Sequence, residues 1–173
     1  HSVYDGTVRC SDGQGGTDTQ DIAFTVTSAN DSAPVITSGN TASVAENATA
    51  VRRVPETGVG QRAQTLTYSI IGGADAARFQ IDANTGVLSF LSAPDFEAPT
   101  DAGGDNVYDV TVQVSDGQGG TDTQAIAVTV TSANDSAPVI TSGNTASVAE
   151  NTTAVMTVTA TDADQPAQTL TYS

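Results

Sequence analysis

The fold is decided by residues 107–131, VYDVTVQVSDGQGGTDTQAIAVTVT. Over residues 107–114 and again over 126–131 every second side chain is apolar, a period typical of a strand with one buried face. The residues on the apolar face are Tyr108, Val110, Val112, Val114, Ile126, Val128 and Val130. The glycine-rich segment 115–120 between the halves predicts a turn. We therefore expect a β-hairpin.

Similar short runs occur elsewhere, at residues 42–46, 65–71, 79–81 and 87–91. Turn-forming segments such as Gly72-Gly73 and Asn84-Thr85-Gly86 separate them. No apolar pattern keeps the 3.6-residue period of a helix. We predict an all-β fold, a seven-stranded Greek-key β-sandwich of the immunoglobulin-like type.

The sequence also repeats itself. The segment starting at Ser11 recurs at Ser115, and that starting at Ala29 recurs at Ala133, a spacing of 104 residues. Aligned in this way, residues 1–69 and 105–173 differ at 16 positions, nine of them between Ala48 and Arg62. A period near 100 residues exceeds that of a solenoid, so each repeat can hold its own core.

Two prolines, Pro34 and Pro138, mark the equivalent boundaries between repeats. We expect residues 1–33 to be the C-terminal part of one repeat, 34–137 a complete repeat, and 138–173 the N-terminal part of a third. The chain is then expected to be part of a longer tandem array.

Composition limits the function. Five basic against 20 acidic residues give a net charge of −15, which disfavours binding to nucleic acid or anionic membranes. The single cysteine, Cys10, has no partner for an internal disulfide. No apolar run is long enough to cross a bilayer, and the first residues do not resemble a signal peptide.

Acidic residues recur in short motifs. The motifs are Ala-Glu-Asn at Glu46 and Glu150, Asp95-Phe96-Glu97, Asn30-Asp31 and Asn134-Asp135 before Ser-Ala-Pro, Asp162-Ala163-Asp164, and Asp12 and Asp116 before glycine. With these motifs in this order, the chain resembles the bacterial cadherin-like repeats of large secreted or surface adhesins. That resemblance implies calcium ions bound at the junctions between repeats.

Carried over residue by residue, the resemblance implies one complete calcium junction. Its ligands would be Glu46, Asp95, Glu97, Asn134, Asp135, Asp162 and Asp164. Calcium accepts six to eight oxygen ligands, and so many carboxylates would repel one another without a cation. The ion should therefore stiffen the linker.

The preceding junction departs from the family pattern. Gly58-Val59-Gly60 stands where the next repeat has Asp162-Ala163-Asp164. Only Asn30, Asp31 and Asp116 would remain there, so we expect weak or no calcium. Asp116 has an alternative role, because Asp-Gly is also a common hairpin turn.

Other chemistry is less well supported by the sequence. Asp95 and Glu97 could be a glycosidase pair, but no second wall of a cleft is indicated. The only histidine, His1, lies at the end of the chain, so serine or threonine nucleophiles would have no general base. The Asn47-Ala48-Thr49 triplet fits the glycosylation pattern, which often matches by chance. We predict that the chain is not an enzyme.

Two functions compete. The first is a structural and adhesive spacer of an extracellular bacterial surface protein, rigidified by calcium and contributing to cell adhesion, matrix or biofilm assembly. The second is a calcium-dependent module that binds polysaccharide. It is disfavoured because tryptophan is absent and Tyr68, Phe79 and Tyr108 fall at core positions of strands.

The expected partners are calcium and neighbouring repeats of the same protein. The two end segments lack cores of their own, so we also expect homotypic strand complementation or filament formation.

Overall fold

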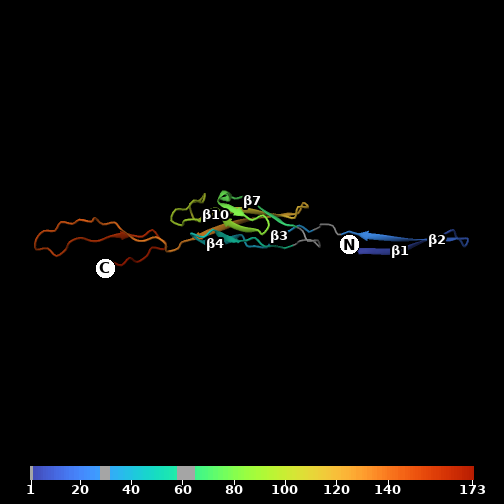
Figure 1. The fold of residues 1–173 in the computed structure, drawn as a ribbon, viewed down its shortest axis with the longest axis horizontal. Helices are drawn as coiled ribbons and strands as arrows, with labels where there is room; N and C mark the ends of the chain where they lie inside the picture. The colour runs from blue at the N-terminus through green and yellow to red at the C-terminus, as the bar shows by residue number, and fades with distance from the viewer. Residues whose placement is uncertain (1, 28–31, 58–64) are drawn as a thin grey trace.

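Three parts of the chain follow one another along the long axis of the molecule (Figure 1). The structure, a computed structural model, describes residues 2–27, 32–57 and 65–173. A hairpin of β1 (Ser2–Ser11) and β2 (Thr17–Val26) lies at one end. A β-sandwich occupies the middle, and residues 138–173 form the other end.

The sandwich consists of two main sheets and one short strand pair. The first sheet has the order β4-β11-β10-β7, with β4 at Thr41–Ala45, β11 at Thr121–Thr131, β10 at Val107–Ser115 and β7 at Thr67–Gly72. The second has the order β5-β9-β8, with β5 at Ala50–Arg53, β9 at Val87–Phe90 and β8 at Phe79–Ile81. The pair joins β3 (Val35–Ile36) to β6 (Glu56–Thr57).

The predicted hairpin is present as β10 and β11, which pair in antiparallel orientation. Their alternating apolar side chains are buried as expected, from Tyr108 to Val114 and from Ile126 to Val130. Leu88 and Phe90 of the second sheet complete the same core. The all-β sandwich is therefore confirmed, and the described residues contain no α-helix, only a 3-10 turn, η1, at Ala76–Arg78.

Aromatic rings fill the centre of the sandwich. The rings of Phe79 and Phe90 stack with centroids 4.4 Å apart. Tyr108 meets Phe90 edge-on at 5.1 Å, a geometry that aromatic pairs prefer. The core positions expected for Tyr68, Phe79 and Tyr108 are confirmed. No aromatic side chain of the described part of the sandwich is left exposed for stacking on a sugar.

The number of strands differs from the expected seven. The described part of the sandwich has nine, because two segments change partners along their length. β3 pairs with β6 in the short strand pair, whereas β4 pairs in parallel with β11 of the first sheet. Val54 and Pro55 separate β5 from β6, and proline cannot donate a ladder hydrogen bond. The simple alternation pattern did not reveal these breaks.

One buried tyrosine gives a testable pH dependence. The Tyr68 hydroxyl donates a hydrogen bond to Oε2 of Glu56. Burial first, then this bond and the Glu56 charge, raise the pKa of Tyr68 to about 12. Above pH 10 the unfolded state loses a proton that the folded state keeps, so the contribution of Tyr68 to stability falls between pH 10 and about 12.

We therefore expect urea midpoints across that pH window to fall more steeply for the wild type than for Tyr68→Phe. Equal slopes would contradict the assigned pKa.

The end segments have strands but little burial. Every described side chain of β1 and β2 is exposed except Ile22, which is half-buried. Residues 138–173 contain only the short pair β12 (Val139–Ile140) and β13 (Ala160–Thr161). Their assignment to flanking repeats stays a prediction. Among the described residues, no helix is both long and apolar enough to cross a membrane.

Candidate metal centre

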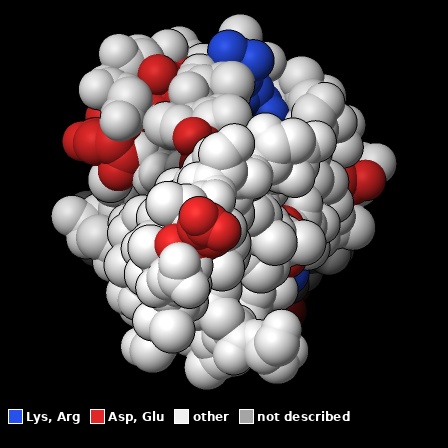
Figure 2. Space-filling view, turned by 90° about the vertical axis from the view of Figure 1, so that its left-hand side faces the viewer, with Lys and Arg blue, Asp and Glu red and all other residues white. Residues whose placement is uncertain are grey.

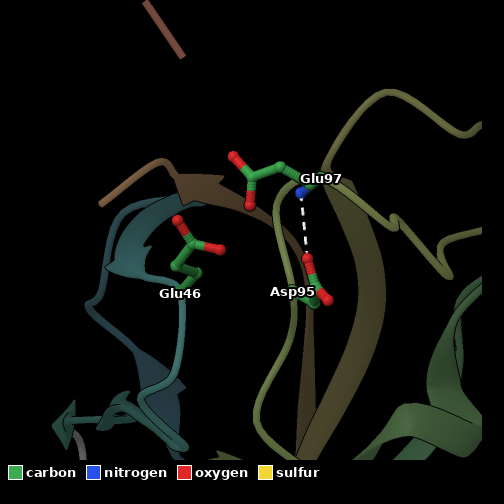
Figure 3. Close-up of side chains that lie close together, drawn as sticks. All are labelled: Glu46, Asp95 and Glu97. Carbon is green, nitrogen blue, oxygen red and sulfur yellow. Dashed lines mark hydrogen bonds between the residues drawn. The ribbon is translucent and has the colours of Figure 1, made fainter. Parts of the chain in front are cut away.

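Carboxylates gather where the sandwich meets residues 138–173. Glu46 directly follows β4, and Asp95 and Glu97 lie in the loop after β9. Figure 3 shows the carboxylates of Glu46 and Glu97 facing each other from these two segments. Asp135 follows β11, and Asp164 follows β13. Five of the seven residues expected at this junction therefore come together from four separate segments.

Glu46 ties two of these segments together. Its side chain is buried. Oε2 accepts a hydrogen bond from the backbone N–H of Phe96 at 2.8 Å, and Oε1 accepts one from Ala133 N–H at 2.5 Å. The Glu46 backbone N–H donates to the carbonyl of Thr131 at 3.0 Å. This glutamate thus fixes the Asp95–Glu97 loop and the linker against the end of β4.

Asp95 shapes its own loop. Its Oδ1 accepts backbone N–H groups of Glu97, at 3.0 Å, and Ala98, at 3.1 Å. This Asx-type turn projects the Glu97 side chain toward Glu46 (Figure 3). One oxygen of each of Glu46, Asp95 and Glu97 lies within 4.8 Å of the others.

Glu97 belongs to a second group as well. Its carboxylate also lies with those of Asp135 and Asp164, again with one oxygen of each within 4.8 Å of the others. Oε1 of Glu97 is buried and has no hydrogen-bond partner among the described residues. Desolvation first, then the charges of Glu46 and Asp135, raise the pKa of Glu97. The site is therefore electrostatically strained around this carboxylate when no cation is bound.

The segment after β13 is held to the linker through Asp164. This buried side chain accepts a hydrogen bond from Ser136 N–H at 3.1 Å and one from Gln168 Nε2 at 3.3 Å. Asp162, expected as a ligand too, lies outside both groups. Its Oδ1 accepts the N–H of Asp164 at 3.1 Å. Asn134 is exposed and, with Asp162, lines a neighbouring groove over residues 138–173.

Two asparagines that the sequence analysis did not assign to the centre also support it. Asn47 has a left-handed backbone, with φ of 63°, and its Nδ2 donates to Asp135 at 2.5 Å. Asn106, also left-handed, donates from Nδ2 to the carbonyl of Phe96 at 3.0 Å. Asparagine adopts this conformation more readily than most residues. The signal for Asn47 was its place beside Glu46, repeated as Asn151 beside Glu150.

The preceding junction is described only in part. Asn30, Asp31 and the Gly58-Val59-Gly60 segment lie outside the described residues. Asp116 is buried, and its Oδ1 accepts the N–H groups of Gln118 and Gly120 at 2.8 and 2.9 Å. Asp12 makes the same two bonds in the first hairpin, to Gln14 and Gly16. Both aspartates thus close a β-hairpin turn.

Among the described residues, no basic side chain forms an ion pair with the carboxylates of this centre. Figure 2 views the end that carries residues 138–173; acidic side chains appear at several places on this face, basic ones mainly at its upper edge. Over residues 2–27, 32–57 and 65–173, the one ion pair joins Arg53 to Glu56 at 3.6 Å. The strongly negative chain therefore has a site that favours a cation.

Comparison with curated proteins gives two relatives. Halomucin of Haloquadratum walsbyi is 49% identical over 37 residues, covering 21% of this chain. Protocadherin Fat 1 of Homo sapiens is 35% identical over 109 residues, covering 58%. The matched part of the chain spans less than 1% of the length of halomucin and 2% of the length of protocadherin Fat 1.

Solved structures match over almost the whole chain. PcdhgB3 EC1-4 has a TM-score of 0.68 and 26% identity, covering 94% of this chain and 41% of that one. Human CDH23 EC21-23 has a TM-score of 0.67 and 19% identity, covering 94% and 55%. These likenesses show a cadherin-like sandwich, a structural and adhesive fold rather than an enzymatic one. This agrees with the expectation that the chain is not an enzyme.

The family follows from a sequence profile described as "Bacterial Ig domain", which matches residues 30–129. This range holds most of the sandwich strands. Since it covers more than half of the 173 residues, the chain belongs to the bacterial Ig domain family, with a cadherin-like strand arrangement.

Proposed function

We propose that the chain is a spacer segment of an extracellular bacterial surface adhesin and that calcium rigidifies the junction after its sandwich. The observation that carries this proposal is the buried Oε1 of Glu97, which has no hydrogen-bond partner in the described part of the chain and belongs to a carboxylate shared by two acidic groups. A bound cation would satisfy this oxygen and offset the mutual repulsion of the carboxylates.

The donor set favours calcium among biological cations. The five grouped side chains offer only carboxylate oxygens, which suit a hard cation and not zinc or copper, whose sites favour nitrogen and sulfur. Oxygens bound to one calcium at 2.3–2.6 Å lie at most about 5 Å apart. The 4.8 Å limit within each group is compatible with that geometry. Two ion positions bridged by Glu97 are the simplest arrangement.

The placement of the ligands supports a mechanical role. Glu46, Asp95 and Glu97 belong to the sandwich, Asp135 to the linker and Asp164 to the segment beyond it. An ion held by all three parts would couple its binding to the angle between them. Without the ion, the grouped charges would push the parts away from one another. Calcium would therefore convert a flexible chain of domains into a stiffer rod.

Tandem organisation supports the same role. The structural likeness to multi-domain ectodomain fragments covers 94% of this chain, well beyond the central sandwich, so it includes the end segments. Residues 1–33 and 138–173 would be parts of the flanking repeats. The close similarity of the copies fits a spacer, whose function is reach. As a spacer of this kind, the chain would be secreted to the bacterial surface and would contribute to adhesion or biofilm assembly.

Thermal unfolding with and without calcium tests this proposal. A ligand that binds only the folded state stabilises it by about 1.4 kcal/mol at ten times its Kd. For a domain near 100 residues this predicts a rise in Tm of roughly 6–11 °C. Circular dichroism should show that rise in millimolar Ca²⁺ relative to EDTA. An unchanged Tm at several millimolar Ca²⁺ would exclude calcium as the stabilising ion.

The next repeat supplies a specific variant. Replacing Asp162 and Asp164 by glycine copies the Gly58-Val59-Gly60 segment of the preceding repeat. We expect most of the calcium-dependent rise in Tm to disappear, because the buried carboxylate of Asp164 leaves the second group. Glu150→Gln, at an exposed position outside both groups, is the matched control and should keep the rise. A full rise in the glycine variant would place the ion elsewhere.

A further inference from the structure

Phe96, the residue between the candidate ligands Asp95 and Glu97, is held at three points. Its backbone N–H donates to Oε2 of Glu46 at 2.8 Å, and its carbonyl accepts a hydrogen bond from Nδ2 of Asn106 at 3.0 Å. Its ring packs against the hydrophobic core of the sandwich. Contacts within the protein therefore fix the peptide units on both sides of Phe96, independently of any cation.

Asn106 is itself anchored to the first sheet through its backbone. Its carbonyl accepts the N–H of Val130 in β11 at 2.9 Å, and its N–H donates to Oδ1 of the buried Asp101 at 3.1 Å. Asn106 directly precedes β10, and Glu46 directly follows β4 of the same sheet. The two hydrogen bonds that hold Phe96 thus come from strand ends of one sheet, a rigid support for a ligand loop.

The stability of the fold does not by itself explain the Asn106 side chain. The residue is only 9% exposed, and its Oδ1 is buried with no hydrogen-bond partner among the described residues. Burying an unpaired acceptor costs free energy, which offsets the stabilisation from the bond between Nδ2 and the Phe96 carbonyl. Buried polar groups in native proteins are rarely left unpaired, so one that is indicates a role beyond stability. Here that role is to hold the loop that carries Asp95 and Glu97.

We propose that Asn106 is a positioning residue of the candidate metal centre, which sets the calcium affinity by holding the Asp95–Glu97 loop without touching the ion. This inference rests on the proposed function, because it takes calcium as the ligand of the centre. The loop faces Glu46 (Figure 3), whose charge repels that of Glu97. A loop that is already fixed against this repulsion loses less conformational freedom when the ion binds, so the ion binds more tightly.

Asn106→Gly separates the side chain from the backbone conformation. Asn106 has φ of 62°, a conformation that glycine adopts freely, so the variant removes the amide and keeps the left-handed turn. Asn151→Gly is the matched control, because Asn151 has φ of 66° and is exposed. Both variants replace asparagine by glycine at a left-handed position. They differ in the contact to Phe96.

Hydrogen exchange in EDTA tests the hold on the loop without calcium. The N–H groups of Phe96, Glu97 and Ala98 donate to carboxylates of the centre. We expect these three amides to exchange several-fold faster in Asn106→Gly, because the loop loses one of its fixed points. Their rates should be unchanged in Asn151→Gly. NMR measures each rate separately, and equal rates in the wild type and Asn106→Gly would overturn the proposal.

Isothermal titration calorimetry with Ca²⁺ tests the affinity. Loss of a contact that orients a metal ligand commonly weakens metal binding by about ten- to a hundredfold, so the Kd for Ca²⁺ should rise by about tenfold or more in Asn106→Gly and stay unchanged in Asn151→Gly. The Tm in EDTA should change little in either variant, because in Asn106→Gly the lost bond and the removed unpaired acceptor offset each other.

Two outcomes of these measurements would contradict the role of Asn106. One is an unchanged Kd for Ca²⁺ in Asn106→Gly. The other is loss of the fold of this variant in EDTA, which would make Asn106 a structural residue. Failure of the proposed function is a different result, because the wild type itself would then bind no Ca²⁺, whereas a wrong role for Asn106 leaves wild-type binding intact.

Discussion

Glu97→Gln should abolish the calcium-dependent rise in Tm while leaving the calcium-free protein at least as stable as the wild type. Glu97 is the one carboxylate common to both acidic groups. Calcium affinity depends on the number of charged ligands, so removing a shared ligand weakens both ion positions. Without calcium, the same change removes a partly desolvated charge that faces Glu46 and Asp135. Calorimetry in EDTA and in Ca²⁺ measures both effects.

The opposite signs of the two effects separate a metal ligand from a structural residue. A glutamate that stabilised the fold by itself would lower the calcium-free Tm when replaced. Glu150→Gln, at an exposed glutamate, controls for the loss of one charge from the chain. If Glu97→Gln keeps the full calcium response, the shared carboxylate is not a ligand. If it destabilises the calcium-free protein, the proposed repulsion is wrong.

Much of the fold could be predicted because burial on one face of a sheet imposes a two-residue period. Tyr108, Val112 and Val128 follow that period and lie in the core. The changes of partner from β3 to β4 and from β5 to β6 could not be predicted in this way. They depend on which sheet each half of a segment reaches, and a pattern of apolar residues does not contain that information.

The candidate site was predictable at the level of segments but not of side chains. The resemblance brought Glu46, Asp95 and Glu97 to one junction, and the structure places them together. Asp162 shares the motif of Asp164 but bonds back to its own turn. Whether an aspartate faces an ion or a neighbouring N–H depends on local backbone geometry, since the same residue favours both roles. The role of Asn47 could not be predicted for the same reason, because it depends on a left-handed backbone at this residue.

Gly73→Ala should strongly destabilise the sandwich. Gly73 has φ of 106°, which alanine rarely adopts. A Cβ atom at this position would also lie 2.4 Å from the carbonyl oxygen of Asp109 and 2.5 Å from the Cα of Val110. Both atoms belong to the backbone of the central strand β10, so no side-chain rotation removes the clash. Strain and overpacking together predict a loss of about 3 kcal/mol or more, or roughly 12–24 °C in Tm.

The adjacent glycine is the matched control for this prediction. A Cβ on Gly72 would meet nothing nearer than the Cβ of Thr111 at 3.9 Å, an ordinary contact. Gly72→Ala should therefore leave Tm nearly unchanged, although it adds the same methyl group one residue earlier. The close approach at Gly73 lets the Asp75 N–H reach the carbonyl of Asp109 at 3.0 Å, and Asp75 Oδ1 in turn accepts the N–H of Ala102 at 2.7 Å. Because Ala102 belongs to the loop that also carries Glu97, hydrogen exchange of that loop should accelerate in Gly73→Ala and not in Gly72→Ala. Equal Tm values for the two variants would mean that β10 can move away from Gly73 at little cost.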